Sequence, residues 1–191
     1  MRRLAPALVA ATLALGCTST VTPADIFGEA GEFHVDVEFT PEQVRALEAA
    51  AATWNHYGNG YVSLTIVQDL DTRSSAMALK CVEGCVVHAL STDGKFQDMD
   101  SRHPDLKTLG VATGVRGTTI LLAVDRLTDL DMFGEVALHE FGHSVGMAHV
   151  SSPHAVMYPH YHRGANCPNA DDMLEFCRVQ DCDLADVQYC K

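Results

Sequence analysis

The sequence predicts an α+β fold, because strand patterns and helix patterns occur together in a chain with room for one domain of ordinary size. Residues 33–39 alternate strictly between apolar and polar side chains, which is typical of a strand with one buried face. Residues 40–58 have the start signals and the apolar spacing of an amphipathic helix. A second helix is expected to follow Asp131 and to end near Gly146.

The first predicted helix begins with three local signals. Thr40 is an N-cap residue, Pro41 suits the first helical position, and Gln43 stands at the capping-box position. The apolar residues of the helix end with Trp54, which we expect in the core. Gly58 marks the end of the helix.

Four further segments predict the rest of the sheet, namely residues 61–67, 86–90, 109–114 and 118–124. Residues 91–108 are polar and rich in turn formers, so we expect a solvated loop there. Residues 171–176 and 183–189 are expected to form short helices near the carboxyl terminus.

The amino terminus has the pattern of an export signal. Arg2 and Arg3 precede an apolar stretch, Leu4 to Leu15, that is too short to span a bilayer comfortably. We therefore expect three parts, which are a signal peptide of residues 1–16, a tether of residues 17–31 and a domain of residues 32–191.

Cys17 bears on where the exported protein is held. Residues 14–17, Ala-Leu-Gly-Cys, resemble the lipobox of bacterial lipoproteins, whose cysteine becomes the lipidated mature amino terminus. A lipid on Cys17 would make the protein a cell-envelope lipoprotein and would be its only contact with a membrane. Ordinary cleavage near Gly16, followed by full secretion, is the alternative.

The cysteine count agrees with export. Of seven cysteines, lipidation of Cys17 leaves six, enough for three disulfides in an oxidising compartment. Cys81 and Cys85 are close enough for a local bridge. The last four are expected to pair among themselves in an order that the sequence leaves open, and they are Cys167, Cys177, Cys182 and Cys190. A zinc site made from these four is a weaker alternative, because CxxC spacing is absent.

The net charge of −12 argues against one class of partner. It becomes −14 when Arg2 and Arg3 leave with the signal peptide. Proteins that bind nucleic acid through its phosphates need a basic surface, so we expect no nucleic acid partner. The acidic balance either favours cationic substrates or simply keeps the protein soluble.

Residues 139–149 have the pattern HExxHxxGxxH and carry the strongest functional signal in the chain. His139 and His143 are four residues apart, so a helix places both imidazoles on one face, within reach of one metal ion. Gly146 can end that helix, and the turned chain can return His149 to the same ion. Three protein ligands with one open position are typical of a catalytic zinc. The alternative is a core-facing helix end that happens to contain three histidines.

This segment resembles the zinc signature of the metzincin metallopeptidases. Met157 follows His149 by eight residues, in the manner of the methionine turn of that family, and residues 149–161 are most similar to the matrixin branch. The resemblance implies a twisted, mostly parallel five-stranded sheet with a backing helix and an active-site helix. It also implies an upper lobe that extends to about residue 146 and a small, disulfide-stapled lower lobe of residues 147–191.

The resemblance further implies a zinc-dependent endopeptidase that cleaves protein or peptide substrates. His139, His143 and His149 would hold one Zn²⁺ as neutral imidazoles. Glu140 would be the catalytic general base that accepts the proton of the attacking water. Met157 would form an apolar floor beneath the imidazoles.

Other parts of the cleft are also implied by the resemblance. Residues 109–124 should contain the exposed edge strand to which a substrate adds through main-chain hydrogen bonds. Pro159 and Tyr161 would help to line the primed-side specificity pocket, and no tyrosine is assigned a role in the transition state. Matrixins carry ions in loops, so a structural Ca²⁺ or a second zinc within residues 91–108 is a further expectation, although no ligand spacing there matches one.

Two other functions remain open from the sequence. One is a surface lipoprotein that binds zinc or a partner on the same scaffold without catalysis, although metal binding alone gives no reason for Glu140. The other is a processing enzyme for a single partner protein. The sequence predicts no particular oligomeric state.

Overall fold

The computed structural model describes residues 31–71, 84–90, 92, 94–102, 107–113 and 119–191. The predicted signal peptide, Cys17 and most of the tether lie outside these residues. Within them, none of the helices combines the length and the apolar character needed to cross a membrane.

A five-stranded sheet forms one layer of the fold, with the strand order β2-β1-β3-β5-β4. Its strands are β1 (Gly31–Asp36), β2 (Leu64–Leu70), β3 (Cys85–Ala89), β4 (Gly110–Thr113) and β5 (Thr119–Ala123). All neighbouring pairs are parallel except β4 and β5, which are antiparallel. The mostly parallel five-stranded sheet expected from the resemblance is therefore confirmed, and β4 is an edge strand.

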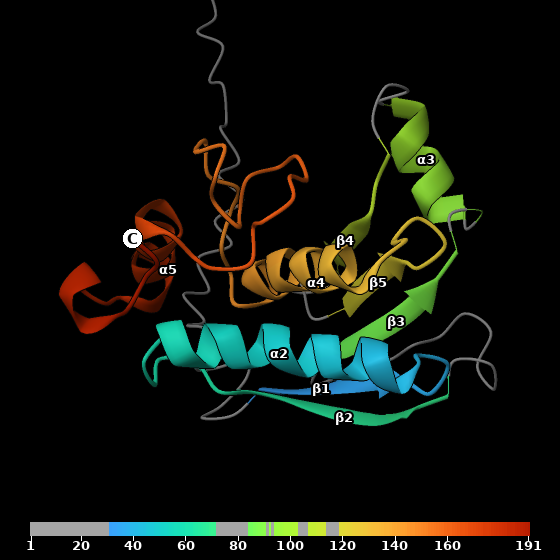
Figure 1. The fold of residues 1–191 in the computed structure, drawn as a ribbon, viewed down its shortest axis with the longest axis horizontal. Helices are drawn as coiled ribbons and strands as arrows, with labels where there is room; N and C mark the ends of the chain where they lie inside the picture. The colour runs from blue at the N-terminus through green and yellow to red at the C-terminus, as the bar shows by residue number, and fades with distance from the viewer. Residues whose placement is uncertain (1–30, 72–83, 91, 93, 103–106, 114–118) are drawn as a thin grey trace, which may run out of the picture.

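Two long helices, α2 (Pro41–Tyr57) and α4 (Leu130–Ser144), lie side by side on one face of this sheet (Figure 1). The core between helices and sheet is apolar, and its largest members include Trp54, Phe33 and Phe141. The Trp54 indole N–H donates to the carbonyl oxygen of Leu138 at 2.8 Å, so α2 and α4 are joined by a buried hydrogen bond as well as by packing.

The start of α2 follows the predicted capping box. The Thr40 hydroxyl accepts a hydrogen bond from the Gln43 N–H at 3.3 Å, and the Gln43 side chain accepts one from the Thr40 N–H at 2.9 Å. Gly58 is the C-cap residue, as predicted. These helix ends could be predicted because the residues that form each of them lie within one helical turn of one another.

The second strand begins three residues later than predicted, at Leu64 instead of Tyr61. Two contacts explain the shift. The Asn55 side chain binds both the N–H and the C=O of Leu64, at 2.7 and 2.8 Å, and so marks the start of the strand. The Tyr61 N–H instead donates to Gly58 at 3.0 Å in the turn that follows α2.

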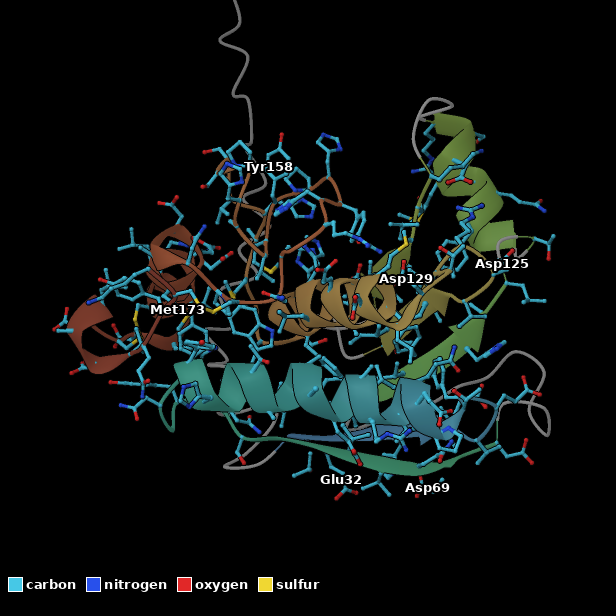
Figure 2. The ribbon with its side chains drawn as sticks, viewed as in Figure 1. Glu32, Asp69, Asp125, Asp129, Tyr158 and Met173 are labelled. Carbon is cyan, nitrogen blue, oxygen red and sulfur yellow. A yellow bond between two sulfur atoms is a disulfide. The ribbon has the colours of Figure 1, made fainter. Side chains whose placement is uncertain are left out.

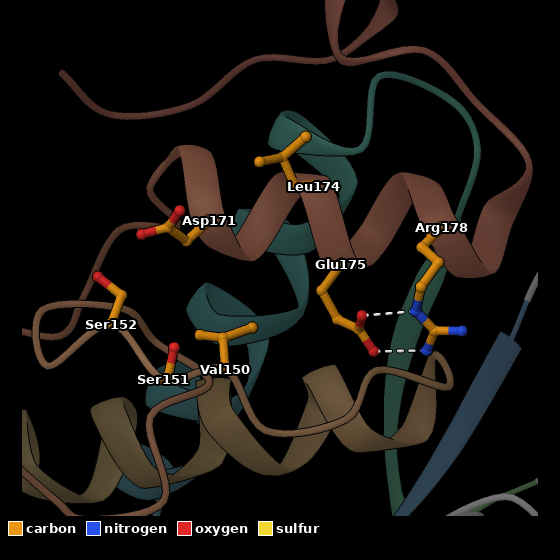
Figure 3. Close-up of a pocket in the computed structure, with 7 residues that line it drawn as sticks. All are labelled: Val150, Ser151, Ser152, Asp171, Leu174, Glu175 and Arg178. Carbon is orange, nitrogen blue, oxygen red and sulfur yellow. Dashed lines mark hydrogen bonds and ion pairs between the residues drawn. The ribbon is translucent and has the colours of Figure 1, made fainter.

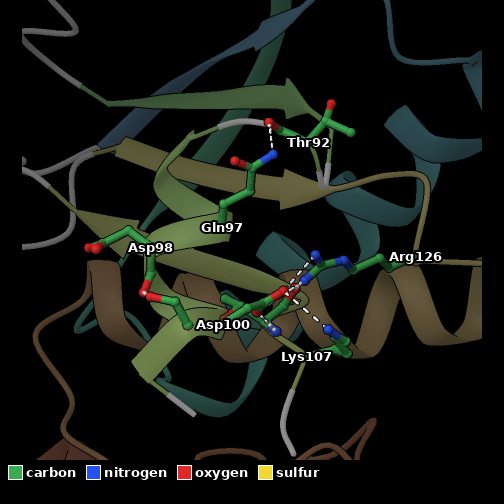
Figure 4. A network of polar contacts seen from close by, with 8 residues as sticks. Thr92, Gln97, Asp98, Asp100, Lys107 and Arg126 are labelled. Carbon is green, nitrogen blue, oxygen red and sulfur yellow. Dashed lines mark hydrogen bonds and ion pairs between the residues drawn. The ribbon is translucent and has the colours of Figure 1, made fainter. Parts of the chain in front are cut away.

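The prediction of a solvated loop at residues 91–108 is wrong for its central part, because Gly94–Arg102 form a helix, α3. Phe96 is fully buried against Ala89 and Ala123. Asp100 binds the Arg126 guanidinium at 2.7 Å and the Thr108 N–H at 3.0 Å (Figure 4). Those two partners lower the pKa of Asp100 to about 2. Tertiary contacts therefore order a segment with weak helix signals.

The described part of residues 91–108 shows no ion site. Among the residues that the structure describes, only His139, His143 and His149 form a group of three or more side chains able to hold a metal. The carboxylates of Asp98 and Asp100 are bound to arginines, Arg102 and Arg126. The expectation of a structural calcium or a second zinc is not supported by this part of the chain.

The carboxyl-terminal region contains helix α5 (Ala170–Gln180) and a short 3₁₀ helix, η2 (Leu184–Asp186). Disulfides join Cys167 to Cys190 and Cys177 to Cys182, so the last four cysteines pair among themselves, as predicted. Cys85 is also disulfide-bonded, while its predicted partner Cys81 lies outside the described residues.

Candidate metal centre

Helix α4 positions the first two histidines of the motif. Its N-cap is Asp129, whose carboxylate accepts a hydrogen bond from the Met132 N–H at 2.8 Å, beside the amino-terminal end of the helix (Figure 2). From this fixed start the helix continues without interruption to Ser144. His139 and His143 are therefore one turn apart on one face, as their spacing predicted.

Gly146 turns the chain immediately after α4. Its φ of +95° lies in the left-handed region that glycine adopts without strain. The Gly146 N–H donates to the carbonyl of His143 and the Met147 N–H to that of Gly142, both at 3.0 Å, which together form a Schellman motif. The turn brings His149 back to the two helical histidines.

The three imidazoles converge on one point. The Nε2 atom of His143 lies 3.1 Å from the Nε2 atoms of both His139 and His149. His139 and His143 use their Nδ1 atoms to donate to the carbonyl oxygens of Val156 and Met147, at 2.7 and 2.9 Å. Because a carbonyl can only accept, the Nε2 atoms of these two rings carry lone pairs that face each other. Such an arrangement is favourable only around a cation.

Electrostatics keep these rings in the ligating form. Burial, together with the neighbouring His143, lowers the pKa of His139 to about 4. Burial also lowers the pKa values of His143 and His149. At neutral pH all three imidazoles are therefore neutral, and three neutral nitrogen ligands fit a zinc ion that keeps an open position.

Glu140 points a buried carboxylate towards the edge strand. It is 5% exposed, and the backbone of Ala112 in β4 hydrogen-bonds to it. Its Oε2 atom is buried and has no hydrogen-bond partner among the described residues. Burial raises the pKa of Glu140 to about 8. A buried carboxylate oxygen without a partner is costly, so this atom is suited to a water molecule or a substrate group that joins the site.

The predicted methionine lies against the metal-binding helix. Met157 is fully buried, and its sulfur packs on Gly142, where a Cβ atom would overlap it. Gly142 stands between His139 and His143 on α4, so Met157 fills the space under that part of the helix. The carbonyl of Met157 accepts a hydrogen bond from the Val150 N–H at 3.0 Å. This bond joins the segment around Met157 to the residue that follows His149.

Helix α5 supports the site through residues that sequence reasoning missed. Asp172 is fully buried and accepts hydrogen bonds from the N–H groups of Val156 and Met157, at 2.9 and 2.8 Å. The Val156 carbonyl in turn accepts from His139. The one signal in the sequence was the capping box of α5, in which Asp172 binds the Asn169 N–H at 2.9 Å.

A second support from α5 reaches the segment that carries His149. The Glu175 carboxylate accepts a hydrogen bond from the Ala148 N–H at 2.9 Å, and Arg178 binds the same carboxylate through two nitrogens, each at 2.6 Å (Figure 3). The Gln180 side chain donates to the Val145 carbonyl at 2.8 Å. Helix α5 thus holds the turn before His149 at two points, Val145 and Ala148.

Replacing Asp172 by asparagine is expected to lower the free energy of unfolding by about 3 kcal/mol, because an amide NH₂ would face buried N–H donors. Urea denaturation of the metal-free protein measures this change. Asp171→Asn is the matched control, since its side chain is exposed on the same helix and the same loss of charge is involved. A difference of less than about 0.5 kcal/mol between the two variants would contradict the role given to Asp172.

Comparison with known proteins agrees with the site. Residues 28–178 match the sequence model of the matrixin family of peptidases. Human neutrophil collagenase is 69% identical over 26 residues, human matrilysin 45% over 56 residues, and human matrix metalloproteinase-17 50% over 32 residues. These alignments cover 14%, 27% and 17% of this chain, and 6%, 21% and 5% of the respective relatives.

The alignments to individual relatives are short, and the chain matches only a small part of each. The family match is much longer, since it extends over most of the sequence. It includes all five strands and the helices α2, α3 and α4. It agrees with the mostly parallel sheet and with the histidine group at the end of α4. The chain therefore belongs to the matrixin family.

Proposed function

We propose that this protein is a zinc-dependent endopeptidase that hydrolyses peptide bonds of extracellular or envelope proteins. The observation that carries the proposal is the juxtaposition of two features. Three neutral imidazoles converge on one point, and the buried Glu140 beside them has a carboxylate oxygen without a partner. Metal binding alone accounts for the first feature but not for the second.

In this proposal the side chains have distinct roles. His139, His143 and His149 hold Zn²⁺, which when bound supplies a Lewis acid for the substrate carbonyl and for water. Glu140 accepts a proton from the attacking water and later delivers it to the leaving amine. The buried Oε2 atom of Glu140, which has no hydrogen-bond partner among the described residues, supports this role.

The edge strand β4 supports the proposed mode of substrate binding. One side of β4 pairs with β5, and no other strand among the described residues pairs with its opposite side. An extended peptide can add to such an edge through main-chain hydrogen bonds. Because Ala112 of this strand also binds Glu140, a peptide on β4 would lie next to the general base.

Replacing Gly110 by alanine is expected to lower kcat at least about tenfold without loss of zinc. A Cβ atom at Gly110 would lie 2.8 Å from Oε1 of Glu140 and 3.0 Å from Cγ1 of Val136, so the carboxylate must move. Steady-state peptide hydrolysis and zinc analysis of the same samples measure the effect. Gly94→Ala is the control, because a Cβ atom there meets nothing within 4 Å. Equal kcat values for the two variants would be inconsistent with this placement of Glu140.

A digest of a diverse peptide library tests the proposed function directly. The zinc-loaded protein should cleave a subset of the peptides, a chelator should stop cleavage, and added zinc should restore it. Glu140→Ala should bind zinc but cleave nothing. If the zinc-loaded protein leaves the whole library intact, the proposal is wrong and a zinc-binding role without catalysis takes its place.

We also propose that the protein acts outside the cytoplasm, as a lipoprotein held through Cys17. The disulfides Cys167–Cys190 and Cys177–Cys182 support an oxidising compartment, and the lipobox-like residues 14–17 support the lipid. Incorporation of labelled lipid should occur in the natural protein and be lost in Cys17→Ser. Equal labelling of both would show that the lipid is not on Cys17, and no labelling of the natural protein would leave ordinary secretion as the route.

A further inference from the structure

Asp100 and Arg126 form an ion pair near the edge strand that the proposed mechanism does not use. The pair joins α3, which precedes β4 in the chain, to the turn that follows β5. The guanidinium contacts both carboxylate oxygens, with Nη2 2.7 Å from Oδ2 and Nη1 3.3 Å from Oδ1 (Figure 4). The two side chains are only 12% and 17% exposed. A two-point contact in a partly buried place fixes the orientation of both side chains, as a single surface ion pair does not.

The same ion pair binds both main-chain groups of Thr108. The Thr108 N–H donates to Oδ1 of Asp100 at 3.0 Å, and Nη1 of Arg126 donates to the Thr108 carbonyl at 2.7 Å. Thr108 stands two residues before Gly110, the first residue of β4. Two side chains from outside the strand therefore fix the direction in which the chain enters β4.

The hydrogen-bond pattern of β4 shows which of its main-chain groups face the free edge. The Ala123 N–H donates to the carbonyl of Leu109 at 2.9 Å, so Leu109 directs its main chain towards β5. In an antiparallel pair, residues that bond to the partner strand alternate with residues whose N–H and C=O point away from it. Gly110 and Ala112 therefore point their main-chain groups away from β5. Thr108 falls in the same alternation, and its groups are already bound.

The part of the edge that begins at Gly110 lies next to the proposed general base. The backbone of Ala112 hydrogen-bonds to Glu140. A Cβ atom at Gly110 would lie 2.8 Å from Oε1 of Glu140. A peptide paired with these two residues would thus pass the carboxylate, and the position of β4 determines where it does so.

We infer that Asp100 and Arg126 are positioning residues of the proposed peptidase, which fix Thr108 and so hold Gly110 and Ala112 ready to bind the main chain of the substrate. This inference rests on the proposed function. A strand that is already ordered binds a peptide without a further loss of conformational freedom, whereas a loose strand must be ordered on binding. The ion pair should therefore act on peptide affinity, since it touches neither Glu140 nor the three histidines.

Replacing Asp100 by asparagine tests this role in peptide hydrolysis. The variant keeps the shape of the side chain, but its amide NH₂ would face one of the two donors that the carboxylate accepts. KM should rise about tenfold, the scale of one hydrogen bond, while kcat changes by less than about threefold because the bound peptide restores the strand. Asp98→Asn is the matched control, because Asp98 pairs with Arg102 on the same helix and both side chains are exposed. It should keep the wild-type KM.

Hydrogen exchange of the zinc-loaded protein without peptide gives a second, direct reading. The amides of β4 should exchange about tenfold faster in Asp100→Asn than in wild type, while those of α2 and α4 exchange as before. A bound peptide should restore the slow exchange. Arg126→Lys keeps the charge but lacks the planar fork that reaches both Asp100 and Thr108, so it should act in the same direction. It also provides the test if Asp100→Asn does not fold.

The outcomes separate this inference from the proposed function. Unchanged exchange in β4, or a KM equal to that of Asp98→Asn, would overturn the inference and leave the peptidase proposal intact. Faster exchange in α2 and α4 as well would show a general loss of stability and would also overturn it. If wild type cleaves no peptide, the peptidase proposal fails, and calorimetry of the same peptides with zinc-loaded protein decides the inference. Tenfold weaker binding by Asp100→Asn would support it, whereas equal binding or none would overturn it.

Discussion

Replacing Glu140 by glutamine is expected to lower kcat for peptide hydrolysis by about 10²–10⁴-fold, the usual contribution of a positioned general base. Glutamine has nearly the same shape as glutamate, so it should keep its place against β4 and Gly110. It cannot accept the proton of water, however, and the step that needs this acceptor slows. The three histidines are unchanged, so zinc should remain bound.

The measurement is steady-state hydrolysis of a peptide found in the library digest, together with zinc analysis of the purified variant. Glu48→Gln is a matched control, because Glu48 is exposed on α2 and the same chemical change is made there. The control should retain the wild-type kcat. A Glu140→Gln variant with kcat within a factor of two of wild type would show that the carboxylate is not the general base.

Replacing His149 by alanine is expected to weaken zinc binding by more than about 100-fold. Loss of a group that only orients a metal ligand costs up to about 100-fold in affinity, so loss of a ligand itself should cost more. His149 is the proposed ligand outside the helix and the most exposed of the three histidines. Its loss leaves two imidazoles, which cannot satisfy the coordination that zinc requires. Peptide hydrolysis should disappear with the metal.

Equilibrium competition with a chromophoric chelator measures the zinc affinity of this variant. His154→Ala is the control, since His154 is an exposed histidine of the same loop that does not belong to the converging group. The control should bind zinc as wild type does. If both variants bind zinc with the same affinity, His149 is not a ligand and the geometry at the end of α4 has another purpose.

Several parts of the fold were predictable because their causes are local in the chain. The capping box of α2 joins residues three positions apart, and His139 and His143 are separated by a single turn. The left-handed turn at Gly146 needs only a residue without a side chain. In each case the interacting groups are neighbours in sequence, so a short pattern contains the whole physical reason.

Other parts were missed because their causes are distant. Helix α3 depends on a bond between Asp100 and Arg126, 26 residues apart, and on burial of Phe96 against two strands. The start of β2 depends on a side chain from the preceding helix. Local propensity is weak in both segments, and tertiary contacts determine the outcome.

The sequence by itself determined the geometry of the histidine group in this protein. The residue types and spacing of HExxHxxGxxH require a helix, a glycine turn and three converging imidazoles, all of which follow from the local geometry of the backbone. Only the tertiary structure decided what surrounds them. It made β4 the edge strand beside Glu140 and placed Asp172 next to the Met157 segment. Each of these results depends on elements that meet only after the chain has folded, so no local pattern could contain it.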